Sequence, residues 1–375
     1  MARRVRQGAD ELRQSEGCRL DGNLPSLLSG PAEERGELKP ERIRSMPKAE
    51  LHRHLAGCMS PEIALKMAAR FGAPVPAGTL PELVRCMVLD SPLTSLQEVL
   101  RRFTLIAHLF VSPDAVRYAA QRAVEDAAAD GLRYMELRFS PGFTSYAHRL
   151  PLDAVTRAVA EGAAEGARLT GCIVPLIVIA SREMGPDVCM ETFRLALRHR
   201  PQVVGVDLAG DEDNHPPEQF IKAFELARGE GLHVTVHAGE QGCADNVATA
   251  VRRLGARRIG HGIRIADRPD LIALVRDQGV ALEISVTSNW IVGAVPSPAE
   301  HPLGQLMAEG IPISLNSDDP ALFGITLSSE LELCRRVVPG LDLVQAQRVA
   351  LDHAFGDPVQ VGKVRQELRE WSLRA

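Results

Sequence analysis

The chain has 375 residues, of which 45% are hydrophobic and 24% charged, as expected for a globular protein with a substantial core. Its net charge of −5 and its 4% of aromatic residues argue against nucleic acid or a membrane as a partner. The seven cysteines are an odd number without a Cys-x-x-Cys pair. This argues against a disulfide framework and, with no secretory signal or membrane-spanning run in view, favours a cytoplasmic protein.

The N-terminal segment, residues 1–44, is polar and charged and lacks a hydrophobic period. We therefore predict a loosely ordered extension, followed by a single domain over residues 45–375. The first strand of that domain is predicted at Ala49–Leu55. A helix then begins at Ser60, where Ser-Pro-Glu supplies an N-cap, a proline at the first helical position and an acid in the first turn.

The segment from 72 to 132 is long for a connection between two strands. It contains two further helix starts, at Ser95, where Glu98 completes a capping-box pattern, and at Ser112. The second helix is predicted to end at Gly131. We expect this helical insertion to lie over the end of the first strand and help cover a pocket. A helical decoration far from any site fits the sequence equally well.

Beyond the insertion, short apolar runs alternate with helical runs such as Leu152–Leu169, Pro217–Gly229 and Pro269–Gln278. Eight such units predict an α/β fold, a (β/α)8 TIM barrel. An open doubly wound sheet is disfavoured because no Gly-x-Gly-x-x-Gly follows the first strand. The seven strands after the first are predicted at Arg133–Ser140, Cys172–Ala180, Val203–Leu208, His233–His237, Arg258–His261, Ala281–Thr287 and Pro312–Ser317.

The first strand carries two histidines, His52 and His54, separated by Arg53. Because side chains alternate between the two faces of a strand, both imidazoles point the same way and can bind one metal ion. Alone, a His-x-His pair is more often a polar strand face. Here it is accompanied by candidate site residues at four other strand ends, which in a TIM barrel converge at the active site. They are Gly210, His237 with Glu240, His261, and Asp318 with Asp319.

Three imidazoles and one carboxylate suit zinc at an open catalytic site. We assign His52, His54, His237 and Asp318 as the metal ligands, and zinc would lower the pKa of its water toward neutrality. His261, between two glycines, is the candidate base. The fourth strand has no lysine to bridge two metals, so a single metal ion is predicted.

Two acids near the ligands remain for the substrate. Glu240 lies three residues beyond His237 and can face the substrate as a proton donor. Asp319 is adjacent to a predicted ligand but points elsewhere, which suits substrate binding. The motifs of cytidine deaminases and of metalloproteases are both missing from the sequence.

As an ordered set, these motifs resemble those of the adenosine deaminase family in the amidohydrolase superfamily. The resemblance extends from Met46 to about Glu330. The matching stretches are Pro47-Lys48-Ala49-Glu50-Leu51-His52-x-His54-Leu55, Glu136 to Pro141, Asp207 to Glu212, His237 to Glu240, Gly260-His261-Gly262, Thr287-Ser288-Asn289 and Ser317 to Pro320.

The resemblance implies a mononuclear zinc barrel, with one Zn²⁺ per chain, that hydrolyses the 6-amino group of an adenine nucleoside to the 6-oxopurine and ammonia. It implies that Glu240 protonates ring N1 and that His261 and Asp318 hold the attacking hydroxide. Asp319 would meet N7 and the backbone N–H of Gly210 would meet N3, with His54 also on the substrate side. The substrate would be adenosine or a 5′-modified adenosine such as aminodeoxyfutalosine.

The sequence departs from the family pattern at three places. Ala56 stands where the family usually has an acid that meets the 5′-hydroxyl group, and Ser285-Val286 replaces Cys-Pro. Trp290 places a large ring near the predicted pocket mouth, where it either stacks on a substituent or packs. The alternatives are a deaminase of free adenine, a purine-binding protein without turnover, and an amidohydrolase of an amide or ester, which the pair of acids Glu240 and Asp319 disfavours.

Overall fold

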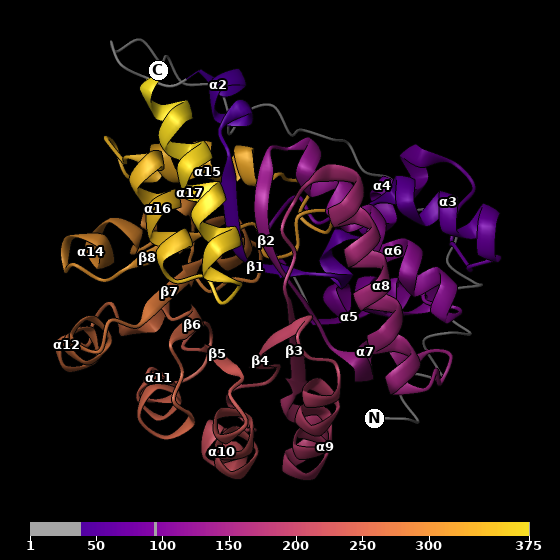
Figure 1. Ribbon diagram of the computed structural model, residues 1–375, viewed down its shortest axis with the longest axis horizontal. Helices are drawn as coiled ribbons and strands as arrows, with labels where there is room; N and C mark the ends of the chain where they lie inside the picture. The colour runs from indigo at the N-terminus through magenta and orange to yellow at the C-terminus, as the bar shows by residue number, and fades with distance from the viewer. Residues whose placement is uncertain (1–38, 94–95, 375) are drawn as a thin grey trace.

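The computed structural model describes residues 39–93 and 96–374. Eight parallel strands follow one another around a single sheet in chain order (Figure 1). A parallel bridge between Arg53 and Asp318 brings the last strand beside the first, which confirms the predicted (β/α)8 barrel. The strands are β1 Lys48–His54, β2 Leu132–Phe139, β3 Leu176–Ser181, β4 Val203–Ala209, β5 His233–Ala238, β6 Arg258–His261, β7 Ala281–Ile284 and β8 Ile313–Leu315.

Three of the predicted strands are too long. The third begins at Leu176 instead of Cys172, and the eighth covers only Ile313–Leu315. The seventh ends at Ile284, and its last predicted residues, Val286 and Thr287, begin helix α13, Val286–Ile291. Residues 285–287 are all buried, and so short a buried stretch has no period that distinguishes the end of a strand from the start of a helix.

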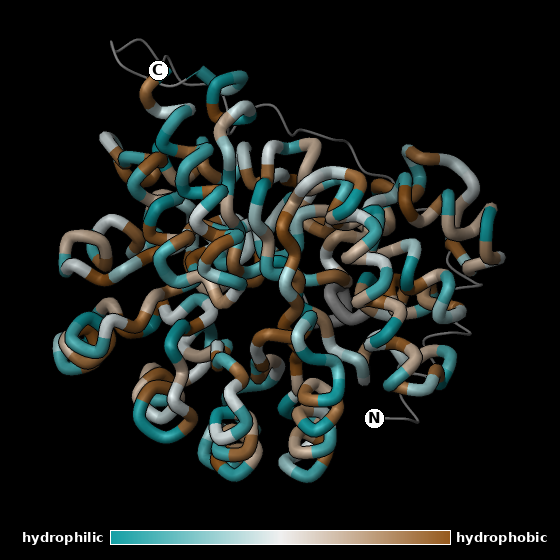
Figure 2. The backbone as a smooth tube through the Cα atoms, in the orientation of Figure 1, coloured by the Kyte–Doolittle hydropathy of each residue, from teal (hydrophilic) through white to brown (hydrophobic). Residues whose placement is uncertain are grey.

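Helices surround the barrel, and in Figure 2 hydrophobic and hydrophilic positions alternate around the outer ones. This is the pattern of helices with one face on the sheet and one in solvent. The longer helices are α3 Pro61–Phe71, α4 Leu80–Met87, α5 Leu96–Leu109, α6 Pro113–Ala129, α8 Leu152–Thr170, α9 Gly185–Arg198, α10 Ile221–Gly229, α12 Pro269–Asp277, α15 Leu327–Val337, α16 Leu343–Asp352 and α17 Pro358–Leu373. The shorter ones are α2 Pro40–Ser45, α7 Pro141–Tyr146, α11 Asp245–Thr249 and α14 Leu303–Ala308.

Two of the predicted helix starts are confirmed. The hydroxyl of Ser60 accepts a hydrogen bond from the backbone N–H of Ile63, and that of Ser112 accepts one from Ala115. Each side chain therefore caps the first turn of its helix. The third predicted start, at Ser95, lies outside the described residues. Helix α6 ends at Ala129, two residues before the left-handed Gly131, which stops the helix as predicted.

Most of the predicted N-terminal extension, residues 1–38, lies outside the described residues. Its last residues belong to helix α2, whose Ile43 is buried. The ammonium group of Lys48 donates hydrogen bonds to three carbonyl groups at the end of this helix, those of Ile43, Arg44 and Met46. The last residues of the predicted extension are therefore helical and hydrogen-bonded to the barrel, in contrast to the loose order predicted for them.

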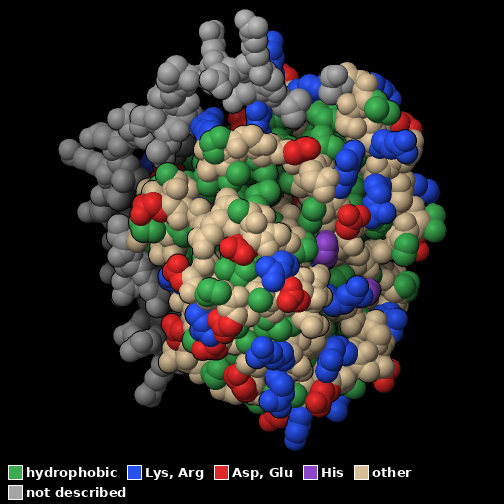
Figure 3. Space-filling model, turned by 90° about the vertical axis from the view of Figure 1, so that its left-hand side faces the viewer, with side chains coloured by type: hydrophobic (Ala, Val, Ile, Leu, Met, Phe, Trp, Pro, Cys, Tyr) green, Lys and Arg blue, Asp and Glu red, His purple; other side chains and the backbone are tan. Residues whose placement is uncertain are grey.

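On the face shown in Figure 3, basic and acidic side chains are interspersed. Among the described helices, none has the length and apolar content needed to cross a membrane.

Candidate active site

His52 and His54 point to the same side of β1, as the strand geometry predicts. Their Nε2 atoms are 3.2 Å apart. Oδ1 of Asp318, just beyond β8, lies 3.2 Å from each of these nitrogens. The side chain of Arg53 instead contacts Glu50 and Ser317. The closing pair of the barrel, β1 and β8, thus brings three predicted metal ligands to one point.

The imidazole of His237 completes the cluster from the end of β5. Its ring centroid lies 4.6 Å from that of His52. Nδ1 of His237 lies 2.9 Å from a carboxylate oxygen of Asp207, and Nδ1 of His52 lies 2.8 Å from one of Glu283. These contacts assign the proton of each ring to Nδ1 and leave both Nε2 atoms as free electron-pair donors.

His261 and Asp318 both have left-handed backbone angles, with φ values of 63° and 61°. Non-glycine residues adopt this conformation rarely, and when they do it is often at functional sites. Both side chains are buried, and Nε2 of His261 lies 3.8 Å from Oδ2 of Asp318. The two strained residues therefore face each other across the cluster.

Two overlapping groups of donor atoms could hold a metal ion, each with its atoms within 4.8 Å of one another. One contains His52, His54 and His237, and the other contains His52, His261 and Asp318. Imidazole nitrogens oriented by buried carboxylates, together with one carboxylate oxygen, form a donor set that fits zinc. The residues present therefore suit the metal that the sequence predicted.

Glu240 and Asp319 lie beside this cluster as protonatable acids. Burial and the nearby charge of Asp318 raise the pKa of Glu240 to about 8. The same two causes raise the pKa of Asp319 well above its usual range. Oδ1 of Asp319 is buried without a hydrogen-bond partner, and Gly57 packs so close that a Cβ there would collide with the Asp319 carboxyl group. A fixed, unsatisfied carboxyl group of this kind is suited to a polar ligand.

These residues border a cavity of about 360 Å³. Its wall includes His54, Gly210, His237, Glu240, His261, Asp318 and Asp319. Gly210 has φ 113°, a conformation that favours glycine. A larger cavity of about 700 Å³ lies on the other side of β1, near Arg53, and its wall contains none of the predicted site residues.

The helical insertion covers the 360 Å³ cavity, as predicted. Its described part contributes Leu89, Leu93 and Phe103 to the wall, all of them apolar. Ala56, which replaces the usual acid of the family pattern, lies on the same wall. Trp290 is half-buried against the hydrophobic core and does not line the cavity.

Three residues of the site were not predicted in these roles, namely Asp207, Glu283 and Asn289. Asp207 and Glu283 orient two of the histidines predicted as ligands, and Asn289 contacts both Glu240 and His261. The sequence does contain a signal for Asp207 and Glu283, because each is a charged residue inside an otherwise apolar strand. Such a residue is buried at a cost and needs a partner.

Arg138 forms ion pairs with both of the carboxylates that orient histidines, those of Asp207 and Glu283. Its guanidinium group donates to Asp207 and to Glu283, each at 2.8 Å, and all three side chains are fully buried. Because removing one partner of a buried ion pair costs about 3–5 kcal/mol, we expect Arg138→Met to lower the free energy of unfolding by that amount. The measurement is urea denaturation of the metal-free protein.

The control for this prediction is Arg133→Met on the same strand. Arg133 forms a solvent-exposed ion pair with Glu367, so its replacement should change stability by about 1 kcal/mol or less. Equal effects of the two substitutions would contradict the role of Arg138.

Comparison with known proteins relates the chain to deaminases. The family model described as adenosine deaminase matches residues 47–371. A curated adenosine deaminase from Shigella flexneri serotype 5b is 36% identical over 314 residues, which are 83% of this chain and 94% of that protein.

Solved structures show the same relationship. The crystal structure of an adenine deaminase from Arthrobacter aurescens matches with a TM-score of 0.80 and 27% identity, over 88% of this chain and 100% of that one. An amidohydrolase from Burkholderia ambifaria, solved with bound zinc, matches with a TM-score of 0.79 and 28% identity, over 92% and 96% of the two chains.

Proposed function

This chain belongs to the adenosine deaminase family of aminohydrolases acting on adenine-type substrates, and we propose that it hydrolyses the 6-amino group of an adenine nucleoside to give the 6-oxopurine and ammonia. The observation that carries the proposal is the placement of a zinc-type donor set and two protonatable acids around one cavity. The metal donors suit activation of water, and the acids suit recognition of ring nitrogens.

We propose that the chain binds one zinc ion through His52, His54, His237 and Asp318. When bound, zinc supplies the Lewis acidity that makes water a nucleophile at neutral pH. Among known proteins of similar structure, the Burkholderia ambifaria amidohydrolase contains zinc.

The residues around the metal donors take the remaining roles. Attack at C6 moves electron density onto N1, where Glu240 donates a proton. Its pKa of about 8 keeps this carboxyl group protonated at neutral pH. His261 and Asp318 orient the attacking water, whose oxygen forms a bond to C6. As the bond from C6 to the amino nitrogen breaks, one proton of the water leaves with the amino group as ammonia. The other proton restores the acid form of Glu240, and the oxygen remains on C6 as the 6-oxo group.

Three residues are proposed to contact the substrate on its purine side. The carboxyl group of Asp319 meets N7, which gives its buried oxygen a partner, and the backbone N–H of Gly210 meets N3. His54 lies on the same wall of the cavity. These contacts involve features that all adenine compounds share, so they do not distinguish adenosine from its 5′ derivatives or from free adenine.

The test is release of ammonia by the zinc-loaded protein from adenosine, deoxyadenosine, aminodeoxyfutalosine, a 5′-thioether adenosine and adenine. Turnover of at least one nucleoside supports the proposal. Turnover of adenine alone would favour an adenine-base deaminase, as the relative from Arthrobacter aurescens is named. Binding without ammonia release would indicate a purine-binding protein without turnover.

Ala56 bears on the choice among nucleosides. Alanine cannot accept a hydrogen bond from a free 5′-hydroxyl group, and the described part of the insertion places apolar side chains on the same wall. A hydrogen bond to a charged acceptor contributes about 1.5–3 kcal/mol, or about tenfold to a hundredfold in specificity. We therefore expect adenosines with bulk at the 5′ position to be accepted as well as or better than adenosine.

The corresponding experiment compares kcat/KM for adenosine, the 5′-thioether and aminodeoxyfutalosine in the wild type and in Ala56→Asp. The substitution should shift the preference toward adenosine by about tenfold or more. The control is Cys58→Ser, two residues after Ala56. Cys58 lines the other cavity, so this variant should leave the order of the three substrates unchanged. A wide preference of the wild type for adenosine, unaltered in Ala56→Asp, would contradict this assignment.

A further inference from the structure

We propose that His301 is a positioning residue for this active site, which acts through the amide of Asn289 on the proton donor Glu240. The inference rests on the proposed function and deepens it. His301 lies just before α14, is buried and is not among the described residues that line the cavity. Its partner Asn289 lies on α13, whose first two residues, Val286 and Thr287, were predicted as the end of a strand.

The hydrogen bonds of His301 determine where its proton lies. The backbone N–H of Leu303 donates to Nδ1 of His301 at 3.0 Å. Because a backbone amide can only donate, Nδ1 carries no proton, and the neutral ring carries its proton on Nε2. Burial lowers the pKa of His301 to about 4, so the ring is neutral at pH 7. Its Nε2–H donates to Oδ1 of Asn289 at 3.1 Å.

This donation determines which way the amide of Asn289 faces. With its oxygen toward His301, its nitrogen lies 2.9 Å from Oε1 of Glu240 and 3.0 Å from Nδ1 of His261. An amide turned by 180° would present its oxygen to both groups instead, with no donor for either. His301 is the contact that distinguishes the two orientations, because it offers a donor and no acceptor at Nε2.

The orientation of the amide sets the protons on the reacting groups. Oε1 of Glu240 accepts from Asn289, so the proton of the acid form is carried by Oε2. Nδ1 of His261 accepts from the same nitrogen, so the neutral imidazole carries its proton on Nε2, which faces Asp318. One buried histidine therefore selects the proton positions of two residues proposed to act on the substrate and the water.

The first experiment compares His301→Leu with His301→Gln in the zinc-loaded enzyme. Leucine fills the space without a donor, whereas the glutamine amide can still donate to Asn289. Since general acids contribute about a hundredfold or more, we expect His301→Leu to lose about tenfold to a hundredfold in kcat with little change in KM or bound zinc. His301→Gln should restore most of the loss. Equal kcat values for both variants and the wild type would overturn the proposal.

A double variant separates positioning from general damage to the fold. If His301 acts through the acid, adding His301→Leu to Glu240→Gln should cost much less than it costs the wild type. If His301→Leu lowers the kcat of Glu240→Gln by the same factor as it lowers the kcat of the wild type, the proposal is overturned. His353→Leu is the matched control, because that half-buried histidine is bonded to a backbone carbonyl group far from the site and should keep full activity.

A measurement without turnover separates this proposal from the proposed function. Nitrogen-15 NMR of the zinc-loaded protein reports which ring nitrogen of each histidine is protonated. We expect a neutral His301 protonated on Nε2, and the assignment comes from the signal that disappears in His301→Gln. A proton on Nδ1 of His301 would overturn the inference even if the enzyme is active. If His301 is neutral and protonated on Nε2 in a protein that releases no ammonia, the inferred proton arrangement stands. Only the proposed deaminase function is then refuted.

Discussion

Replacing His237 with alanine should remove most of the bound zinc and almost all activity. The imidazole of His237 is one of the three assigned as metal ligands, and Asp207 holds it with Nε2 directed inward. With three ligands in place of four, the site holds zinc weakly. The measurements are metal content after gel filtration and ammonia release from the best nucleoside.

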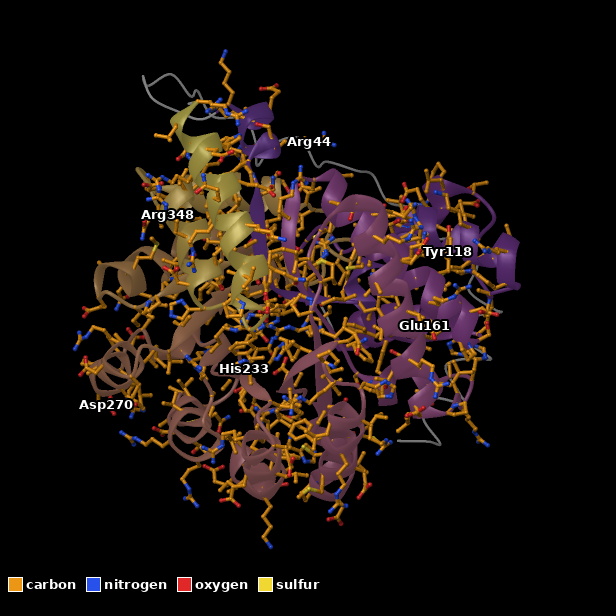
Figure 4. All side chains as sticks on the ribbon, viewed as in Figure 1. Arg44, Tyr118, Glu161, His233, Asp270 and Arg348 are labelled. Carbon is orange, nitrogen blue, oxygen red and sulfur yellow. The ribbon has the colours of Figure 1, made fainter. Side chains whose placement is uncertain are left out.

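The matched control is His233→Ala on the same strand. His233, labelled in Figure 4, is the first residue of β5 and lies at the opposite end of the strand from the cluster. Its ring stacks on that of Phe355, with the two ring centroids 4.5 Å apart. This variant should retain its zinc. Full occupancy in His237→Ala, or two zinc ions per wild-type chain, would contradict the assignment of a single site with four ligands.

Glu240→Gln should lower turnover by about a hundredfold or more while zinc remains bound. Glutamine keeps the shape of the side chain and its place beside Asn289, but it has no acidic proton to give to N1. The wild-type rate should also fall as pH rises through the elevated pKa of Glu240, because the acid form is lost there. This decrease in rate at alkaline pH should be absent in Glu240→Gln.

The control for Glu240 is Glu225→Gln, which makes the same change on the exposed face of α10 and should leave the rate unaltered. Turnover of Glu240→Gln within a few fold of the wild type would rule out a proton-donor role. Loss of zinc together with turnover would instead show that the residue supports the metal site.

The arrangement of the site was largely determined by the sequence. Parallel strands with crossover helices place all their carboxyl ends on one side of a barrel, so residues at those ends must converge. The position of His237 at the end of β5 and of Asp318 just after β8 could therefore be predicted without coordinates. The same holds for His52 and His54, because alternation along a strand is a local property of the backbone.

The tertiary structure decided how the site residues are oriented and protonated. Arg138, Asp207 and Glu283 come from three different strands, and their contacts depend on side-chain directions that no local pattern encodes. The role of the Asn289 amide depends in the same way on its contacts with Glu240, His261 and His301, which come from three distant segments. The sequence by itself determined which residues at the strand ends meet. Only packing between distant segments determined which atom of each residue donates and which accepts.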